Sequence, residues 1–375
     1  MKKSIAGLLG LVSLPVIGSP KGMNTIDQLS SKQGKDVFKL LRKQLLLDKN
    51  LVYLNTGSLG PSPRQVVNKV RDMTHKLESN PVVMNWGELG KKMEKVRSTA
   101  ADFFNVEAED IILTRNTTEG LSLVGASLKL NKGDEILTTN NEHRGGEVGL
   151  EYMAQLNGAT LRKIEMPMPA KSKAEIIELI RSSILPNTKV LLLSHVVTIT
   201  GLRMPVEEIS KITREKGILF IVDGAQAPGM IKVDLGKMGA DVYATSGHKW
   251  LLGPKETGII YINRNVQERI KPVFTYSGYA SYSASSGTRN VATIIGLGEA
   301  LSFLMSIGLD KIEEQVVMLS NYCREKVSEI NGLEVISPSD DSISSAIVSV
   351  RCQKANNRDL FQALRNENII VKLLP

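Results

Sequence analysis

Two residues that could do chemistry together, Asp223 and Lys249, each follow a run that reads as a buried strand. Asp223 ends the run Leu219–Asp223, and Lys249 comes four residues after the run Val242–Thr245. In sheets of parallel strands, ligands bind at the carboxyl ends of the strands. We therefore expect the carboxylate and the amine to meet at one edge of the sheet, although a structural salt bridge is the simpler reading of an isolated pair.

The pair suits one cofactor in particular. A lysine amine can form a Schiff base with an aldehyde, and pyridoxal phosphate carries an aldehyde next to a pyridine nitrogen. That nitrogen must stay protonated for the ring to accept electrons, and a buried carboxylate beside it keeps the proton in place. Lys249 is thus the candidate cofactor lysine, and Asp223 is the candidate partner of the pyridine nitrogen.

Candidate phosphate ligands occur at two other places. A phosphate group is bound well by a helix N-terminus together with hydroxyl donors. Thr117 and Thr118 lie where the strand-like run Ile111–Thr114 turns into a helix, and Ser246 and His248 offer donors beside the lysine. These four side chains are therefore expected to hold the phosphate of the same cofactor.

His143 follows another predicted strand and offers a flat ring that could stack on the cofactor. Taken alone, it would read as a histidine of a surface loop. It gains weight because six motifs occur in order along the chain: NTTEG, NEHRGG, SHVVTITG, VDGAQAPG, SGHKWLLGPKETGIIYI and SGTRN.

Together these motifs resemble the class V aminotransferases, which have the pyridoxal-phosphate fold of type I. The similarity runs from about Leu51 to Ala300 and more weakly to the end. The subgroup of isopenicillin-N epimerase-like proteins resembles the chain best, and cysteine desulfurases and selenocysteine lyases are related. The resemblance implies an enzyme that acts at the Cα of an amino acid. The alternatives are a desulfurase-like enzyme, or a truncated cofactor-binding protein with weak or no activity.

The resemblance also implies roles for single residues. Lys249 would hold the cofactor and move a proton, Gln226 would donate to the ring hydroxyl, and His143 would stack on the ring. Desulfurases often carry asparagine where this chain has Thr198. Thr288 would reach the phosphate of the partner subunit, which implies a homodimer with shared sites. The cofactor-binding residues implied are Thr117, Thr118, His143, Thr198, Asp223, Gln226, Ser246, His248, Lys249 and Thr288.

For the substrate, the resemblance implies that Asn55, Thr56 and Gly57 line the mouth of the site. Family members usually grip the substrate carboxylate with an arginine near the C-terminus, and a bidentate arginine holds a carboxylate in register. The sequence has no arginine after Arg365, so Arg289 and Arg203 are the candidate substitutes, and truncation at Pro375 is an alternative.

The two cysteines do not sit in a recognisable desulfurase loop. Cys323 lies in a predicted amphipathic helix and Cys352 ends a predicted strand. Both are interpreted as packing residues. Neither is expected to be a sulfur-transfer nucleophile, and no cluster of cysteine and histidine has the spacing of a metal site.

Strands alternating with helices predict an α/β fold of the pyridoxal-phosphate type I class. We expect a mainly parallel seven-stranded sheet between layers of helices. We divide the chain into a large cofactor domain over 51–265 and a smaller α+β domain over 266–375. The predicted strands are Ile111–Thr114, Glu135–Thr139, Thr160–Glu165, Val190–Ser194, Leu219–Asp223, Val242–Thr245 and Gly258–Ile262. The predicted intervening helices are Glu119–Leu128, Gly146–Asn157, Ala174–Leu185 and Val206–Lys216. Two further helices, Pro61–Ser79 and Trp86–Phe104, are predicted before the first of these strands.

The flanking regions have their own patterns. Residues 1–22 combine Lys2 and Lys3 with a short apolar run, which is typical of a signal segment. This favours export to a periplasmic or membrane-surface site, with a cytoplasmic location as the alternative. Residues 23–50 are expected to hold a helix over Asp36–Leu47. In the small domain we expect helices Thr293–Ser306, Asp310–Ile330 and Arg358–Asn366, and strands Ala346–Arg351 and Ile369–Lys372.

The amino-acid composition limits the classes of partner that the chain is expected to bind. The 375 residues carry 47 Lys and Arg against 39 Asp and Glu, a net charge of +8, but only 5% are aromatic. A surface that stacks single-stranded nucleic acid needs aromatic side chains among its basic residues, so nucleic acid is not expected as a partner. No apolar run reaches the roughly 18 residues of a membrane span. A small amino acid remains the expected partner.

Overall fold

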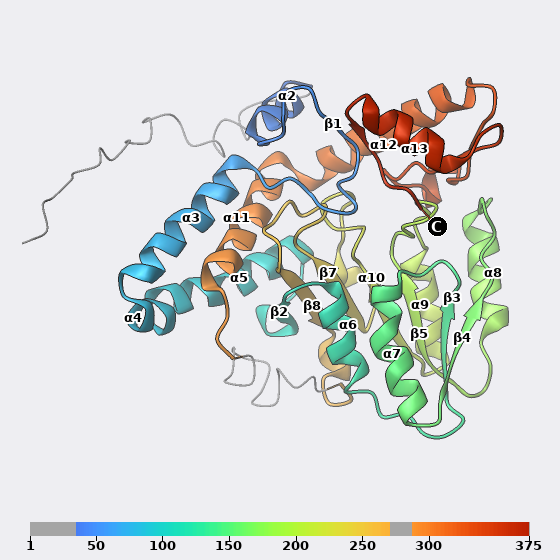
Figure 1. Cartoon of the computed structure of the whole chain (residues 1–375). Helices are drawn as coiled ribbons and strands as arrows, with labels where there is room; N and C mark the ends of the chain where they lie inside the picture. Colours follow the sequence, from blue (N-terminus) through green and yellow to red (C-terminus); the bar gives the residue numbers. More distant parts are fainter. Residues whose placement is uncertain (1–34, 271–286, 375) are drawn as a thin grey trace, which may run out of the picture.

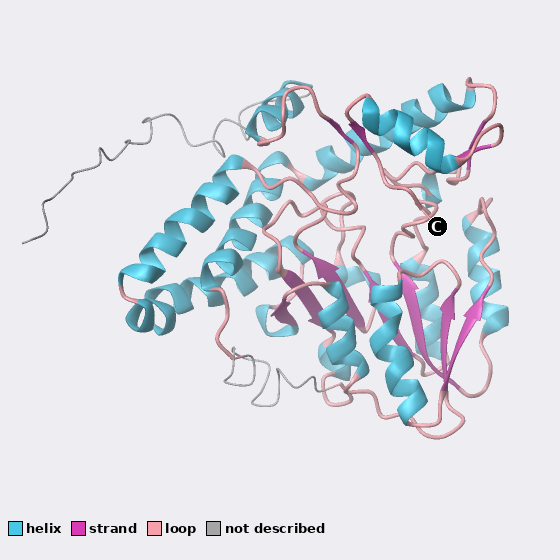
Figure 2. Cartoon of the chain, viewed as in Figure 1, coloured by secondary structure: helices cyan, strands magenta, loops and turns pink. Residues whose placement is uncertain are grey.

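The computed structural model describes residues 35–270 and 287–374. Outside these residues lie the proposed signal segment 1–22, the first part of the segment 23–50, and residues 271–286. Figures 1 and 2 show a broad sheet with helices on both faces, and a second group of helices and short strands above one edge of it.

The central sheet has seven strands in the order β2-β8-β7-β6-β5-β3-β4. Only β8 runs antiparallel to its neighbours, so the mainly parallel seven-stranded sheet is confirmed. Four of the predicted strand ranges match to the residue, and the others differ by one or two residues at an end. The strands are β2 (Ile111–Thr114), β3 (Glu135–Thr139), β4 (Thr160–Ile164), β5 (Thr188–Ser194), β6 (Leu219–Asp223), β7 (Val242–Ser246) and β8 (Gly258–Ile262).

The middle strands are apolar on both faces because each face carries its own core. In β6, Phe220 packs into one cluster of buried residues, while Ile221 packs into the other. Successive strand residues point to opposite faces, so the continuous apolar run of β6 fills both cores. This alternation requires helices on both sides of the sheet.

The two faces are covered by different helices, which matches the layered arrangement in Figure 1. One core receives side chains from α6 and α7, and the other from α5, α9 and α11. The helices of this part are α3 (Arg64–Ser79), α4 (Pro81–Trp86), α5 (Glu88–Phe104), α6 (Thr117–Gly125), α7 (Arg144–Leu156), α8 (Lys173–Ser183), α9 (Val206–Glu215), α10 (Leu235–Met238) and α11 (Val291–Ile307).

Sequence reasoning misplaced some helix ends. It began one helix at Trp86, whereas α4 ends there and α5 starts at Glu88, because Gly87 leaves the helical conformation with φ −102° and ψ −112°. It also began α3 at Pro61, whereas the helix starts at Arg64. Pro63 caps α3 in an extended conformation, since proline fixes φ and fits best at or before the first turn.

The C-terminal part is built from α12 (Leu309–Ser328), β9 (Leu333–Val335), β10 (Val350–Cys352), α13 (Asn357–Asn366) and β11 (Ile369–Ile370). β9 was missed because three residues carry too little periodicity. The division at residue 265 stays a prediction. α11, which that division assigns to the small domain, packs against α3 and α5 of the large one.

A short parallel pairing ties the two ends of the described chain together. β1 (Val52–Tyr53) pairs with β11, and the Leu54 amide donates to the Ile370 carbonyl at 2.9 Å. The sequence gives no sign of this pairing, because its partners lie more than 300 residues apart. It brings the C-terminal segment beside the loop that follows β1, above the carboxyl edge of the sheet (Figure 1).

Two smaller expectations concern surface and membrane. Cys323 is exposed on α12, so its interpretation as a packing residue is wrong, while Cys352 is partly buried at the end of β10. Within residues 35–270 and 287–374, no single helix is both long and apolar enough to cross a bilayer. The pair α11 and α12 meets that criterion only together, and it bends by 76° between them.

Candidate active site

Asp223 occupies the carboxyl end of β6 and is 5% exposed. Its Oδ1 accepts the Ala225 amide at 2.9 Å. A Cβ atom added at Gly146 would lie 2.5 Å from Asp223 Oδ2, so only a glycine lets the N-terminus of α7 come this close. Burial raises the pKa of Asp223, and the charge of Lys249 acts in the opposite direction. The carboxylate is therefore held rigidly in a site that favours a neighbouring positive charge.

Lys249 lies in the turn after β7, and burial is the main cause that lowers its pKa, while Asp223 raises it. The two groups are thus close enough for each to act on the other's titration, as the sequence predicted. Its backbone is also enclosed. The Gly60 amide donates to the His248 carbonyl at 2.6 Å, and a Cβ at Gly60 would lie only 2.0 Å from the Lys249 carbonyl oxygen. A lysine with a lowered pKa is nearer to the neutral, nucleophilic form.

Thr117 and Ser246 meet at the start of α6. The Thr117 amide donates to Ser246 Oγ at 3.0 Å, and the two hydroxyl oxygens lie 2.7 Å apart. The helix is capped by Asn116, which accepts the Glu119 amide at 2.8 Å. The structure therefore brings two of the four predicted phosphate ligands together at a helix N-terminus, where an anion is stabilised.

Thr118 and His143 lie where α6 and α7 begin. A Cβ at Gly145 would lie 2.5 Å from Thr118 Oγ1 and 3.0 Å from His143 Nδ1, so both side chains converge on this glycine. His143 caps α7, with Nδ1 accepting the Gly145 amide at 3.1 Å. Burial and the charge of Lys249 lower the pKa of His143. Its ring is therefore neutral near pH 7 and faces the same group of charges as Asp223 and Lys249.

Gln226 links the segment after β6 to the loop after β1. Its Nε2 donates to the Gly57 carbonyl at 2.9 Å, and its Oε1 accepts the Trp250 indole N–H at 2.7 Å. Because an indole nitrogen only donates, it fixes which end of the Gln226 amide carries the oxygen. One amide hydrogen of Gln226 is left for another acceptor, which agrees with the predicted donor to a ring hydroxyl. The same contacts place Gly57 at the site, as predicted, with Asn55 and Thr56 preceding it in the loop.

Two other predicted ligands have less definite positions. His248 is partly buried, and burial and Lys249 lower its pKa. Thr198 is partly buried in the segment after β5. Within the described residues, neither side chain has a hydrogen bond to Asp223 or Thr117. The cofactor roles of His248 and Thr198 therefore stay predictions.

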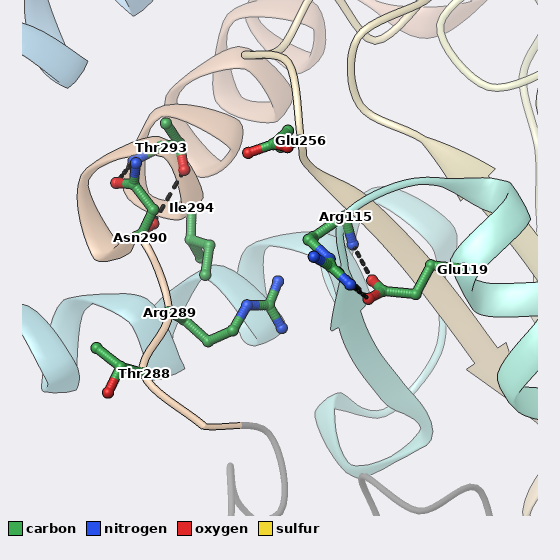
Figure 3. A pocket seen from close by; sticks show the side chains of 8 residues that line it. All are labelled: Arg115, Glu119, Glu256, Thr288, Arg289, Asn290, Thr293 and Ile294. Atoms are coloured by element: carbon green, nitrogen blue, oxygen red, sulfur yellow. Dashed lines mark hydrogen bonds and ion pairs between the residues drawn. The ribbon is translucent and has the colours of Figure 1, made fainter.

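Thr288 and Arg289 lie away from this group, in a pocket of about 410 Å³ (Figure 3). Arg289 donates to the Leu113 carbonyl at 3.1 Å, and Thr288 is exposed. The pocket's other lining residues are Arg115, Glu119, Glu256, Asn290, Thr293 and Ile294. Within the described residues, no contact joins Thr288 to Asp223 or Lys249. The role of Thr288 toward a partner subunit and the substrate role of Arg289 stay predictions.

Sequence reasoning missed Lys372. Its positive charge contributes to the lowered pKa of both His143 and Lys249, so it lies near the site, two residues after β11. The signal was a cation at the end of the predicted strand Ile369–Lys372, but its place depends on the pairing of β11 with β1. Arg203, the other candidate, is engaged elsewhere, because its guanidinium pairs with Glu313 at 2.6 Å.

Asn141 and Glu142 were also missed as site residues. Asn141 is 4% exposed, and its Nδ2 is one of the few buried polar atoms of the described chain that have no hydrogen-bond partner. Glu142 accepts hydrogen bonds from Thr139 and Ser194, and burial raises its pKa to about 7. A buried donor without a partner is expected where a ligand completes the structure.

These groups fit pyridoxal phosphate by their chemistry. The arrangement offers a carboxylate for a pyridine nitrogen at Asp223, an amine for an aldehyde at Lys249, and hydroxyls at a helix N-terminus for a phosphate. Gly146 and Gly145 let the start of α7 lie directly against Asp223 and Thr118, where the Cβ of any other residue would clash.

Comparison with known proteins gives an independent view. A family model described as Aminotransferase class-V matches residues 52–373. Isopenicillin N epimerase of Amycolatopsis lactamdurans is 29% identical over 332 residues, which cover 83% of each chain. A probable cysteine desulfurase of Halalkalibacterium halodurans is 31% identical over 342 residues, covering 86% of this chain and 82% of that protein.

Solved structures share the fold. A cysteine desulfurase from Thermococcus onnurineus NA1 aligns with a TM-score of 0.76 and 25% identity, covering 89% of this chain and 87% of that one. A mutant of C-DES, with glycine covalently linked to its PLP cofactor, aligns with a TM-score of 0.79 and 24% identity, covering 89% and 91%. Together with the sheet topology, these similarities confirm the expected fold of type I.

Proposed function

The chain belongs to the class V aminotransferase family, and from this premise we propose that it is a pyridoxal-phosphate enzyme acting at the Cα of an amino acid. The observation that carries the proposal is the position of Asp223, Lys249 and His143 at the carboxyl edge of the sheet. Asp223 and Lys249 each act on the other's pKa, and both charges act on the pKa of His143. A structural salt bridge would not need the histidine or the two glycines that let the start of α7 approach Asp223 and Thr118 so closely.

Each residue has a distinct task in this proposal. Lys249 binds the cofactor's aldehyde carbon and afterwards carries a proton to or from the substrate's Cα. Asp223 keeps the pyridine nitrogen protonated, and His143 covers one face of the ring. When bound, the cofactor withdraws electrons from the Cα and so weakens its bonds. Thr117, Thr118, Ser246 and His248 hold the phosphate, with Thr198 and Gln226 contributing to the ring end.

We propose that Lys372 holds the substrate carboxylate. It is exposed, and its charge acts on both Lys249 and His143. A carboxylate is a suitable partner for a cation that lies near the Lys249 amine, since it offsets the repulsion between the two positive charges. An ammonium is a point charge without the fork of a guanidinium. We therefore expect weaker control of substrate orientation than an arginine would give.

A desulfurase-like reaction is the second candidate, favoured by relatives that are 31% identical over most of the chain. Such a reaction needs a nucleophile to accept sulfur. Cys323 is exposed on α12, and Cys352 is partly buried at the end of β10. Neither thiol is among the groups that act on the titration of Lys249 or His143. The first proposal therefore fits these residues better.

The deciding experiment combines spectroscopy with product analysis. Purified protein is expected to show the visible absorbance of a lysine-bound pyridoxal cofactor, and Lys249→Ala should lose the adduct that borohydride fixes to the protein. An adduct retained in Lys249→Ala would overturn the assignment. A panel of amino acids, with and without a keto acid, followed by mass spectrometry in deuterated water, then separates the reactions. Epimerisation gives deuterated substrate of inverted configuration, transamination gives a keto acid, and desulfuration converts cysteine to alanine, with sulfide released when a thiol reductant is added.

We further propose a homodimer with shared sites. Thr288 and Arg289 lie on the surface of a pocket apart from Lys249, and the resemblance implies that Thr288 serves the phosphate site of the second subunit. Analytical ultracentrifugation of the loaded protein is expected to show a dimer, and a monomer with full activity would contradict this proposal.

Export remains a proposal that rests on residues 1–22. Lys2 and Lys3 precede an apolar run, as in a signal segment. N-terminal sequencing of the protein recovered from its host, together with cell fractionation, checks this. An intact Met1 in the cytoplasmic fraction would contradict it.

A further inference from the structure

Glu142 connects the ends of two strands that border the cofactor site. Its Oε1 accepts the Thr139 hydroxyl at 2.8 Å, and its Oε2 accepts the Ser194 hydroxyl at 2.5 Å. Thr139 is the last residue of β3 and Ser194 the last of β5. Both carboxylate oxygens are thus used to join neighbouring strand ends, and the residue that follows is His143.

The same turn is fixed from its own backbone. The Asn141 amide donates to Thr139 Oγ1 at 3.2 Å, so this hydroxyl accepts one bond while it donates the other to Glu142. His143 then caps α7. Hydrogen bonds therefore hold the turn from Thr139 to His143 at both ends. Within the described residues, the Glu142 carboxylate is the only side chain of this turn that is hydrogen-bonded to β5.

Glu142 also stands close to Asp223. Ser194 is paired with Asp223 in the register between β5 and β6, so their side chains point to the same face of the sheet. The Ser194 hydroxyl reaches Glu142, which places a second carboxyl one strand away from Asp223. The negative charge of Asp223 adds to the effect of burial and raises the pKa of Glu142. The other groups that act on the pKa of Glu142 are uncharged: the Thr139 and Ser194 hydroxyls and the Ser194 backbone amide.

We propose that Glu142 is a positioning residue of the cofactor site, which holds the ring of His143 in place by tying its turn to the end of β5. The inference rests on the proposed contact of His143 with the cofactor ring. A glutamate suits this task because two hydroxyls can donate to one carboxylate at once. A loose turn would let the His143 ring change its angle to whatever it covers.

The test uses full-length protein loaded with pyridoxal phosphate and compares Glu142→Ala, Glu142→Gln and Ser194→Ala. The readouts are the circular dichroism of the cofactor's visible band and the dissociation constant of the cofactor. Glu142→Ala is expected to reduce the dichroism and to raise the dissociation constant about tenfold, the range for losing hydrogen bonds to a charged group. Ser194→Ala should change both in the same direction, but less.

Glu142→Gln separates position from charge. Glutamine can still accept one hydroxyl and donate to the other oxygen, so the dichroism should stay near that of the wild type. The pH dependence of the visible band around pH 7 should decrease, because the carboxyl beside Asp223 is gone. Glu151→Gln is the matched control, since Glu151 pairs with Arg144 on the exposed side of α7 and should leave every readout unchanged.

The outcomes are distinct. If the wild type has a visible band and Glu142→Ala keeps its dichroism and affinity, the inference is wrong while the proposed function stands. If the wild type has no visible band, the proposed function fails and the inference with it. Should Glu142→Ala not fold, Thr139→Val and Ser194→Ala remove the two ends of the same tie and must both lower the dichroism.

Discussion

The carboxyl edge of the sheet and the pocket around Thr288 differ in how much of a site one chain supplies. At the edge, β6 delivers Asp223, the turn after β7 delivers Lys249, and α6 begins beside Ser246. The pocket holds Thr288 on the surface, with Arg289 bound to the Leu113 carbonyl. The first region has its groups gathered within one chain. The second presents a hydroxyl that contacts none of them.

Strand topology explains why one region gathers its functional residues within one chain and the other does not. Parallel strands place their carboxyl ends together whatever loops connect them, so neighbouring strand ends form a site by topology alone. Thr288 instead lies just before α11 and not at the end of a strand, so no strand pairing places it at the edge of the sheet. Its proposed task at the phosphate depends on a second chain. Four variants test this contrast, and the first three are ordered by their expected effect on the site.

Asp223→Asn should have the largest effect, because it removes the charge at the pyridine nitrogen while keeping the shape of the side chain. Turnover is expected to fall on the order of a hundred- to a thousandfold, the range for losing one preorganised electrostatic contact. The cofactor should still bind through Lys249. Steady-state kinetics and the visible spectrum of the same sample check this, and turnover within threefold of the wild type would contradict the role of Asp223.

Lys372→Ala tests whether the C-terminal segment completes the edge. Loss of a charge-assisted hydrogen bond to the substrate carboxylate should raise KM about ten- to a hundredfold. The cofactor spectrum should not change, because Lys372 is not proposed to touch it. Lys372→Arg is the matched control and should keep KM near the wild-type value. An unchanged KM in Lys372→Ala would return the search for a carboxylate anchor to Arg289.

These two residues also show how far sequence carries the prediction. Asp223 was predictable because one apolar run, Leu219–Val222, ends in an acid, and the strand rule then places it. β5 and β8 were predictable for the same reason, since each is a short and mainly apolar run. Lys372 was not, because its position depends on β1 pairing with β11 across the whole chain. No local pattern reports such a pairing.

Glu142 shows a second limit of sequence reasoning. It stands beside His143 in the motif NEHRGG, yet nothing in the spacing shows that its carboxylate joins β3 to β5. Both hydrogen bonds depend on the strand order, in which β3 and β5 are neighbours although β4 lies between them in sequence. The motif pointed to His143 as a site residue. The contacts by which Glu142 supports its turn could be found only from the structure.

Thr288→Val tests the second region and should have a smaller effect. If its hydroxyl binds the phosphate in the partner's site, the dissociation constant of pyridoxal phosphate should rise up to about tenfold, the worth of one hydrogen bond. Mixing refolded Thr288→Val chains with Lys249→Ala chains gives the sharper result. Mixed dimers would combine an intact lysine with an intact threonine in one site and restore a phase of wild-type affinity. Without that phase, the shared-site proposal fails.

The last variant concerns the stability of the fold behind the edge. His195 is buried, its Nδ1 lies 2.9 Å from the Tyr243 hydroxyl, and burial lowers its pKa to about 3. The unfolded chain takes up a proton at this residue below about pH 6.5, whereas the folded chain does not until about pH 3. The stability of the fold is therefore complete above pH 6.5. It should fall by about 1.4 kcal/mol per pH unit as the pH decreases from there towards 3.

His195→Gln should remove this part of the pH dependence, since glutamine takes up no proton in either state. Urea unfolding between pH 7 and pH 4.5 measures the slope, and His75→Gln is the matched control because His75 is exposed on α3. Equal slopes in the wild type and His195→Gln would show that His195 becomes protonated in the folded state. That result would mean that the core behind Asp223 accepts a charged histidine. It would weaken the contrast between the carboxyl edge of the sheet and the pocket around Thr288.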